Sequence, residues 1–347
     1  MIKFMGSARL SRGLFCAFAI TGAAPVLADH MGPSALGSGG GMSVFGPDTL
    51  DGGHWAAGAR LTTTRPDQRP DARLEALANA GIGAHNTDVN FAGSLSVAYG
   101  ISHHLTVSAE LPYVRRERLR EGVAGEGVEQ LGTVAGIGDA NLLGKYRLTE
   151  GDRSGFAIIA GIKLPTGSTQ RRSPDGERLE TEHQPGTGSW DPIFGASAGT
   201  RVGPVQLTAS TLYQISTRGS QDTRLGNRFQ GGIALSHRFG GSHAIMPHDT
   251  HNHHHGDELD EAHEAPRGSS WDAFVELAGE WEGRQRIGRE IEQASGGRWA
   301  WVAPGLRFNA ASGWSVSGGL ALPVWQRIRA SHPDNRYRLS LSLGRAF

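Results

Sequence analysis

One stretch of this chain, residues 240–270, gathers side chains that bind metal ions. It holds seven of the 15 histidines, with six aspartates and glutamates between them. Neutral imidazoles beside carboxylates suit Zn²⁺, Cu²⁺ or Ni²⁺. The spacing fits no rigid site, and a solvated linker whose histidines titrate near pH 6.5 remains the alternative. The predicted metal ligands are His243, His248, His251, His253, His254, His255 and His263.

A second set consists of charged residues that occupy the polar positions of alternating segments. If the apolar positions face lipid, these charges face the inside of a barrel, where charges of both signs must pair or stay hydrated. Two interpretations stay open: the charges border a narrow aqueous passage, or they form a salt-bridged plug. The predicted lumen-lining residues are Arg60, Glu110, Asp139, Lys145, Arg147, Lys163, Arg228, Arg238, Glu276, Glu280 and Arg307.

Catalytic signals are weak. There is no G-x-S-x-G elbow and no H-E-x-x-H helix. The run GDANLLGK has five residues between its glycines where a phosphate loop needs four, and Tyr146 replaces the required Ser or Thr. His85, His103 or His104 beside a serine would be the base of a hydrolase. We instead expect a protein that is no enzyme and requires no cofactor.

The residue pattern at the C-terminus predicts the type of secondary structure that positions these groups. Tyr337, Leu339, Leu341 and Leu343 alternate with small or polar residues, and the chain ends on the aromatic Phe347. This period of two indicates a strand with one apolar face. Its aromatic end resembles the C-terminal signal that the barrel assembly machinery of the bacterial outer membrane reads. A final edge strand of a soluble sandwich is the alternative.

Eleven earlier segments alternate in the same way, and no run of 18 or more apolar residues follows the N-terminus, which excludes a helical membrane protein. We predict an all-β fold, a closed antiparallel transmembrane β-barrel of about twelve strands, because an open edge would leave unpaired amides in lipid. The earlier segments are 55–63, 89–99, 105–113, 140–148, 156–164, 190–200, 205–215, 229–239, 271–281, 302–308 and 314–324.

The connections alternate between short and long, as in outer-membrane barrels with short periplasmic turns and long outer loops. The short ones are 100–103, 149–154, 201–204 and 309–313, and the long ones are 65–86, 116–137, 165–189, 216–226, 283–297 and 326–335. With both termini periplasmic, the His-rich insert 240–270 falls on the periplasmic side.

The N-terminus predicts export. Residues 1–28 have a positive start, a short apolar core and a V-L-A end, which indicates a cleaved signal peptide. The only cysteine, Cys16, lies inside it, so the mature chain has no thiol for a disulfide. Removing three basic residues leaves 31 basic against 34 acidic groups, which gives no basic excess for nucleic acid. Residues 29–52 are Gly- and Ser-rich and form either a flexible extension or a segment in the lumen; the barrel is predicted over 53–347.

Four stretches resemble a known family. They are Gly136–Leu148, Gly161–Gly167, Gly186–Pro192 and the aromatic C-terminus. Together they look like the bacterial outer-membrane family labelled "putative MetA-pathway of phenol degradation", often described as a transporter. The resemblance implies a barrel of about twelve strands that passes small hydrophobic or aromatic compounds. The His-rich insert lies outside the family's general pattern.

The sequence thus predicts an outer-membrane channel or transporter for small solutes, with outer-membrane lipid, the barrel assembly machinery and a small-molecule solute as partners, and no nucleic acid. The alternative is a metal-binding accessory of a metal-efflux or homeostasis system that uses the His-rich loop. Conductance without the loop would favour the channel, and metal binding without conductance would favour the accessory.

Overall fold

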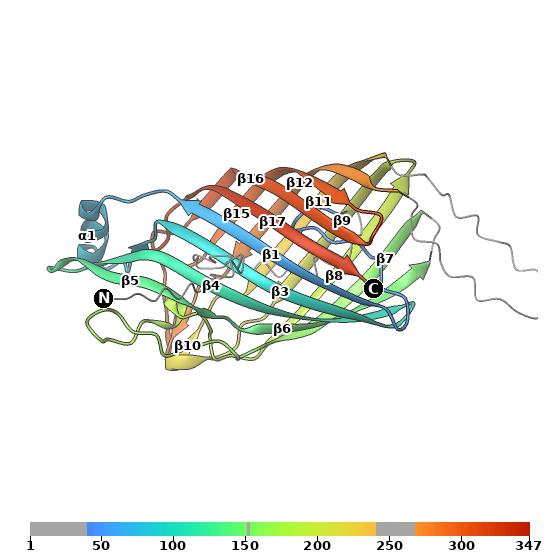
Figure 1. Ribbon diagram of the computed structural model, residues 1–347. Helices are drawn as coiled ribbons and strands as arrows, with labels where there is room; N and C mark the ends of the chain where they lie inside the picture. The colour runs from blue at the N-terminus through green and yellow to red at the C-terminus, as the bar shows by residue number, and fades with distance from the viewer. Residues whose placement is uncertain (1–39, 151–152, 241–267) are drawn as a thin grey trace, which may run out of the picture.

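The computed structural model describes residues 40–150, 153–240 and 268–347. Their strands form a closed antiparallel barrel, which confirms the predicted fold (Figure 1). Because β5 and β6 pair with successive parts of β4, they make one wall strand, and the wall has twelve. The wall comprises β1 (Trp55–Pro66), β3 (Val89–Ser102), β4 (Leu105–Val123), β5 (Gly127–Ile137), β6 (Ala140–Glu150), β7 (Ser154–Leu164), β8 (Asp191–Val202), β9 (Val205–Gln214), β11 (Arg228–Gly240), β12 (Ser270–Glu282), β15 (Gly297–Asn309), β16 (Trp314–Ile328) and β17 (Asn335–Ala346).

The first and last strands close the ring. β1 pairs with β17 from Ala56↔Ala346 to Pro66↔Asn335, with one irregularity near Arg65. Beyond this ladder, Trp55 and Phe347 exchange backbone hydrogen bonds of 2.8 and 3.2 Å. The aromatic end residue is therefore a paired member of the sheet, and the seam leaves no unpaired strand edge in lipid.

The barrel is polar inside and apolar outside, the reverse of a soluble protein. On β17, Leu341 is 50% exposed and Leu339 is 45% exposed, whereas Ser340 and Arg338 between them are 5% and 8% exposed. Other strands repeat this alternation, for instance Leu235 outside and Ser236 inside on β11. An outward apolar surface of this extent requires a hydrocarbon environment, in agreement with the predicted outer-membrane location.

Introducing a charge on this outer surface should impair assembly. We expect Leu341→Arg to destabilise the folded barrel by about 2–4 kcal/mol, because the guanidinium would face lipid near the middle of the strand. Heat-modifiable gel mobility of the refolded protein measures the folded fraction. Ser340→Ala, a change on the inner face of the same strand, should fold normally; equal folding of both variants would contradict the lipid-facing assignment of Leu341.

Aromatic side chains lie near both ends of the strands. At the end that carries the short turns, Trp271 contacts Phe308 with ring centroids 4.9 Å apart, and Trp55 contacts Tyr99 with centroids 4.5 Å apart. At the other end, Trp190 and Trp325 are exposed. These positions match the interfacial bands of outer-membrane barrels. Sequence reasoning did not find Trp299 and Trp301, which are buried inside the barrel.

The end with the long connections is more ordered than the sequence indicated. The connection expected at 116–137 is instead largely strand, because β4 and β5 continue the ladder up to a turn at 124–126. Within the connection at 65–86 lies α1 (Asp71–Asn79), whose Leu74 and Leu77 pack on Ala84 and Val128. These small apolar clusters sit beyond the barrel wall and hold the outer hairpin in place. Among the described residues, no helix is long and apolar enough to cross a membrane.

Short elements complete this end. They are β2 (His85–Asn86), η1 (Thr181–His183), η2 (Ser220–Asp222), β10 (Thr223–Arg224), β13 (Arg286–Ile287) and β14 (Glu290–Ile291). β2 pairs with β4, and β10, β13 and β14 form a separate small sheet. Together with α1 and the β4–β5 hairpin we call them the outer cap; Figure 1 shows α1 and the hairpin at the end opposite the C-terminus.

The His-rich insert falls largely outside the described residues. Its flanks Gly240 and Ser270 pair with each other, and Ser270 pairs with Asn309 at the end that carries the short turns. Periplasmic placement and metal binding by the insert therefore stay predictions, as do the signal peptide 1–28 and the structure of 29–39.

Candidate functional site

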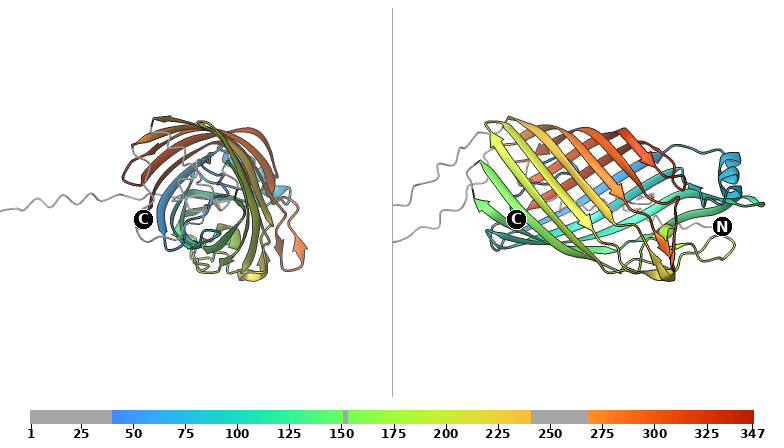
Figure 2. Two further views of the ribbon diagram at one scale, coloured as in Figure 1. Left: turned by 90° about the vertical axis from the view of Figure 1, so that its right-hand side faces the viewer. Right: turned by 180° about the vertical axis from the view of Figure 1, so that it is seen from behind.

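Residues 40–50, which we call the lumen segment, lie inside the barrel. Viewed along the barrel axis, this early part of the chain is seen within the ring of strands (Figure 2). Met42 and Val44 are buried. The amide of Ser43 donates to Glu276 Oε2 at 2.9 Å, and that of Leu50 donates to Thr106 Oγ1 at 2.8 Å. The segment thus runs from β12 on one side of the lumen to β4 on the other.

Two of the predicted lumen cations hold the carbonyl groups of this segment. Arg307 Nη2 donates to the carbonyls of Gly40 and Gly41 at 2.9 and 3.2 Å, and Lys145 Nζ donates to Gly46 at 3.2 Å. A Cβ added at Gly41 would collide with the Glu276 carboxylate and lie 3.2 Å from the Ala234 Cβ on the wall. Glycine therefore permits the backbone to approach the wall closely at this point.

The three internal family motifs meet at Lys163. Its Nζ lies 2.8 Å from Asp139 Oδ2 and 2.9 Å from Asp191 Oδ2, and all three side chains are buried. Asp139 also accepts from the Thr187 amide at 2.8 Å, and Asp191 accepts from Gln214 Nε2 at 2.8 Å. One cation therefore joins β7, β8 and the residue that directly precedes β6, and polar donors contact the two carboxylates as well.

Close backbone packing explains the glycines of these motifs. A Cβ at Gly186 would lie 2.4 Å from the carbonyl carbon of Gly167, and a Cβ at Gly167 would lie 2.7 Å from that of Gly138. Only glycine allows the three segments to approach so closely. The motifs thus build the rigid wall around Lys163.

The other predicted lumen residues are mostly placed in ion pairs or against the wall. Arg238 pairs with Asp272 at 2.7 Å, Glu280 with Arg338 at 2.7 Å, and Arg228 with Glu282 at 3.5 Å. Asp272, Arg338 and Glu282 were not predicted as lumen residues; Asp272 occupies an inward position of β12 and could have been found by the same alternation. Arg60 and Glu276 are buried, Glu110 is half-buried, and Arg147 donates to the Thr149 carbonyl near a short turn.

Two small cavities lie between the outer cap and the interior wall. Each has a volume of about 90 Å³, and both are bordered by Thr62, Arg116, Glu182 and Arg228. Drug-sized pockets occupy about 300–1,000 Å³. The lumen is consequently constricted here, with room for water or a very small solute.

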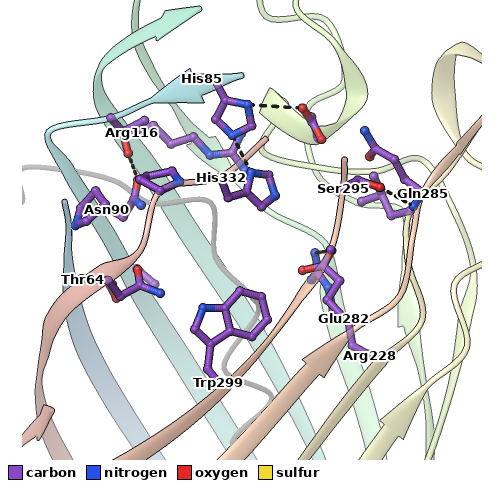
Figure 3. A pocket seen from close by; sticks show the side chains of 18 of the residues that line it. Thr64, His85, Asn90, Arg116, Arg228, Glu282, Gln285, Ser295, Trp299 and His332 are labelled. Atoms are coloured by element: carbon purple, nitrogen blue, oxygen red, sulfur yellow. Dashed lines mark hydrogen bonds and ion pairs between the residues drawn. The ribbon is translucent and has the colours of Figure 1, made fainter. Parts of the chain in front are cut away.

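A cluster of buried imidazoles and one carboxylate borders the outer cavity. His85 Nδ1 lies 3.6 Å from Glu182 Oε1, and His183 Nε2 lies 3.8 Å from the same oxygen. His332 Nδ1 lies 2.9 Å from His85 Nε2 (Figure 3). Burial lowers the pKa of His85 and of His183 well below the usual range, so both rings are neutral at pH 7. His85 was considered as a base in the sequence, but its partners come from distant connections.

Four carboxylates of the cap face one another: Glu121, Glu129, Glu180 and Glu292. Burial, followed by repulsion from the other three, raises the pKa of Glu121 from 4.5 to about 7. The folded cap therefore binds a proton more tightly than the unfolded chain. The contribution of this carboxyl to stability is fully present below pH 4.5 and is lost as the pH rises through about 7, because the folded state then loses the proton it preferred.

This shift gives a pH prediction for the cap. With EDTA present, the ionisation of Glu121 should speed amide hydrogen exchange over residues 120–123 at pH 8 relative to pH 5, after correction for intrinsic exchange rates. Glu121→Gln should remove most of this difference, because the amide cannot ionise. Glu126→Gln, on the turn of the same hairpin, serves as control. An unchanged pH response in Glu121→Gln would contradict the role of this carboxyl.

The closed sheet and its outward apolar face define a barrel of the outer-membrane kind. The family model described as "Putative MetA-pathway of phenol degradation" matches residues 46–246, more than half of the chain, and the chain belongs to that family. An outer membrane channel from Pseudomonas putida F1 has a similar structure, with a TM-score of 0.54 and 16% identity, covering 86% of this chain and 97% of that chain. The CymD monoaromatic hydrocarbon channel is more distant, with a TM-score of 0.41 and 11% identity, covering 95% and 99%. A search of curated proteins found no match.

These comparisons confirm the family resemblance read from the motifs, the barrel fold and the outer-membrane location. They contain nothing on the His-rich insert.

Proposed function

We propose that this protein is a gated outer-membrane channel for small solutes, and that phenol-like compounds are the class its outer cavity suits best. The observation that carries the proposal is the polar, charged interior with two cavities, set inside an apolar outer wall. The lumen segment and the outer cap would be the two gates, since each narrows the interior from a different end.

The lining of the outer cavity supports the solute class. Trp299 offers an apolar aromatic face, and Thr64, Asn90 and Gln285 offer hydroxyl and amide groups around it (Figure 3). A flat ring with one hydroxyl can stack on the indole while its hydroxyl bonds to an amide. The family description names phenol degradation, which points to the same chemistry.

The charges of the wall favour a passage for a small polar solute rather than a sealed plug. Arg228 and Glu282 border the outer cavity, and their closest atoms are 3.5 Å apart, at the limit of a hydrogen bond. Such a loose pair leaves groups that a solute or water can contact during passage. Lys163, Asp139 and Asp191 border the second cavity, but their ion pairs of 2.8 and 2.9 Å are tighter.

Ion current across a planar bilayer tests the proposal. We expect the refolded protein to show brief openings, and phenol to interrupt them in proportion to its concentration. Trp299→Ala should weaken the phenol effect, whereas Trp271→Ala, at the lipid-facing rim, should leave it unchanged. A folded protein that never conducts would refute the channel, and an effect of phenol that is equal in all three proteins would refute the solute class.

A further inference from the structure

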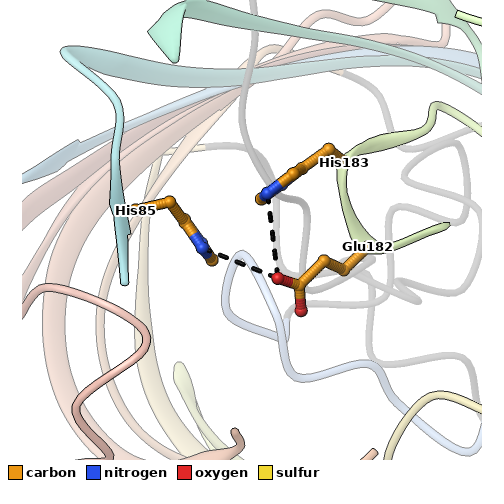
Figure 4. Close-up of side chains that lie close together, drawn as sticks. All are labelled: His85, Glu182 and His183. Atoms are coloured by element: carbon orange, nitrogen blue, oxygen red, sulfur yellow. Dashed lines mark ion pairs between the residues drawn. The ribbon is translucent and has the colours of Figure 1, made fainter. Parts of the chain in front are cut away.

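We propose that His85, Glu182 and His183 form a binding site for a divalent transition-metal ion, with Zn²⁺ as the best-suited ion. Figure 4 shows the three side chains turned toward one another from two separate connections. Their ligand atoms all lie within 4.8 Å of one another. This site is separate from the His-rich insert, since it is built from residues of the outer cap.

The distances match a shared ion better than direct hydrogen bonds. At 3.6 and 3.8 Å, the two imidazole–carboxylate contacts exceed hydrogen-bond length. Tetrahedral Zn²⁺ with bonds of about 2.0–2.1 Å places its ligand atoms roughly 3.4 Å apart. Small side-chain movements would therefore complete a site with three protein ligands and one open position. Two histidines with one glutamate are a common ligand set for Zn²⁺.

An unsatisfied buried atom points to the same conclusion. His183 is 2% exposed, and its Nε2 has no hydrogen-bond partner among the described residues. A buried imidazole nitrogen without a partner is costly. This nitrogen faces Glu182 Oε1, and an ion bound between the two atoms would be coordinated by both.

His332 supplies the support that metal-binding imidazoles usually have. Its Nδ1 contacts His85 Nε2, the ring nitrogen opposite the one that faces Glu182. Metal ligands commonly use their second ring nitrogen in such a contact, which fixes the ring orientation and the tautomer. A proton on Nε2 of His85 would leave Nδ1 free to bind the ion.

The surrounding charge favours a cation despite two nearby arginines. Glu180, Glu292 and Glu121 lie close enough to Glu182 for their charges to act on it. Arg116 and Arg69 oppose them near His85. A divalent ion bound among these carboxylates would relieve the repulsion that they exert on one another when ionised.

The bound ion would join distant parts of the cap. His85 belongs to the β1–β3 connection, Glu182 and His183 belong to the β7–β8 connection, and the supporting His332 belongs to the β16–β17 connection. The ion would hold these connections together above the outer cavity, which His85, Glu182 and His332 border.

Zn²⁺ binding to the full-length refolded protein tests the site, measured calorimetrically against a competing chelator. We expect one tight site in the wild type that His183→Ala and Glu182→Gln remove. His332→Phe should lower its affinity about 10–100-fold, and His54→Ala, an exposed control, should not change it. Co²⁺ in place of Zn²⁺ should give the visible spectrum of a tetrahedral complex only when His183 is present. Gel mobility checks that each variant is folded.

Deletion of residues 243–263 distinguishes metal binding at this site from metal binding by the His-rich insert. The tight site should survive the deletion, while weaker binding is lost. Loss of tight binding on deletion, or its persistence in both His183→Ala and Glu182→Gln, would overturn the proposal. An effect of Zn²⁺ on current rests on the proposed channel function: Zn²⁺ should reduce openings in the wild type and not in His183→Ala. A silent channel that still binds one Zn²⁺ would refute only the channel.

Discussion

Replacing Lys163 with methionine is expected to destabilise the barrel by about 3–5 kcal/mol, the cost of breaking a buried ion pair from one side. The substitution keeps the approximate volume of the side chain but removes its charge. Asp139 and Asp191 would then face each other without the cation that now lies within 2.9 Å of both. Urea unfolding of the detergent-refolded protein, followed by tryptophan fluorescence, measures the change.

Lys145→Met is the matched control, because it removes the other lysine of the barrel wall. Lys145 donates to the Gly46 carbonyl and bridges no pair of carboxylates, so a smaller loss of stability is expected. The triple change Lys163→Met, Asp139→Asn and Asp191→Asn should recover much of the stability, since no unpaired charge remains buried. Similar stability of Lys163→Met and wild type would show that the network does not hold the wall together.

Deleting residues 40–50 is expected to raise the single-channel conductance several-fold. The lumen segment occupies the interior between β12 and β4, and its removal would leave only the outer cap across the passage. The barrel should still fold, because the segment contributes no wall strand. Planar-bilayer recording at matched protein density measures the step size of the openings.

Replacing residues 40–50 with a Gly-Ser segment of equal length distinguishes the effect of filling the lumen from the effect of chain length on the conductance. Such a segment loses Met42 and Val44, which are buried against the wall, so it should leave the lumen more often. We expect conductance between that of the wild type and that of the deletion. Steps of wild-type size in the deletion would contradict a gating role for the lumen segment.

The alternation of large and small residues made the wall predictable. Leu339 and Leu341 face outward and Ser340 faces inward in the structure, as the period of two required. Each of the twelve wall strands coincides with a segment predicted from the sequence, and only residues 190, 215 and 347 at the segment ends fall outside the observed strands. The ends of the strands were less predictable, because β4 and β5 extend beyond the membrane, where their residues need no lipid-facing pattern.

The partners of the lumen charges could not be predicted from single positions. Alternation places Lys163 inside, but it does not show that Asp139 and Asp191 meet there. That meeting depends on the register between three strands and on close contacts between the glycines of three motifs. The motifs were recognised as a family pattern, whereas the salt bridge that joins them appears only in the fold.

The cluster of histidines in the outer cap could not be predicted from the sequence, for a similar reason. His85, His183 and His332 are isolated histidines in three connections, with no spacing that indicates a metal site. The metal ligands were instead predicted among the closely spaced histidines at 243–263. Only the folding of long connections over the lumen brings the dispersed residues together.

The central claim, that solutes pass through a lumen which the chain's own N-terminal segment obstructs, can be tested with the double variant Val44→Cys and Gly232→Cys. A Cβ at Gly232 would lie 2.7 Å from Val44 Cγ2, which places the two positions close enough for a disulfide, and 2.9 Å from the Leu277 carbonyl oxygen, so the backbone must shift slightly to admit it. The predicted mature chain has no other cysteine. Current across a planar bilayer should be nearly absent in the oxidised protein and should appear after reduction. Equal currents before and after reduction, with the disulfide verified, would contradict the account.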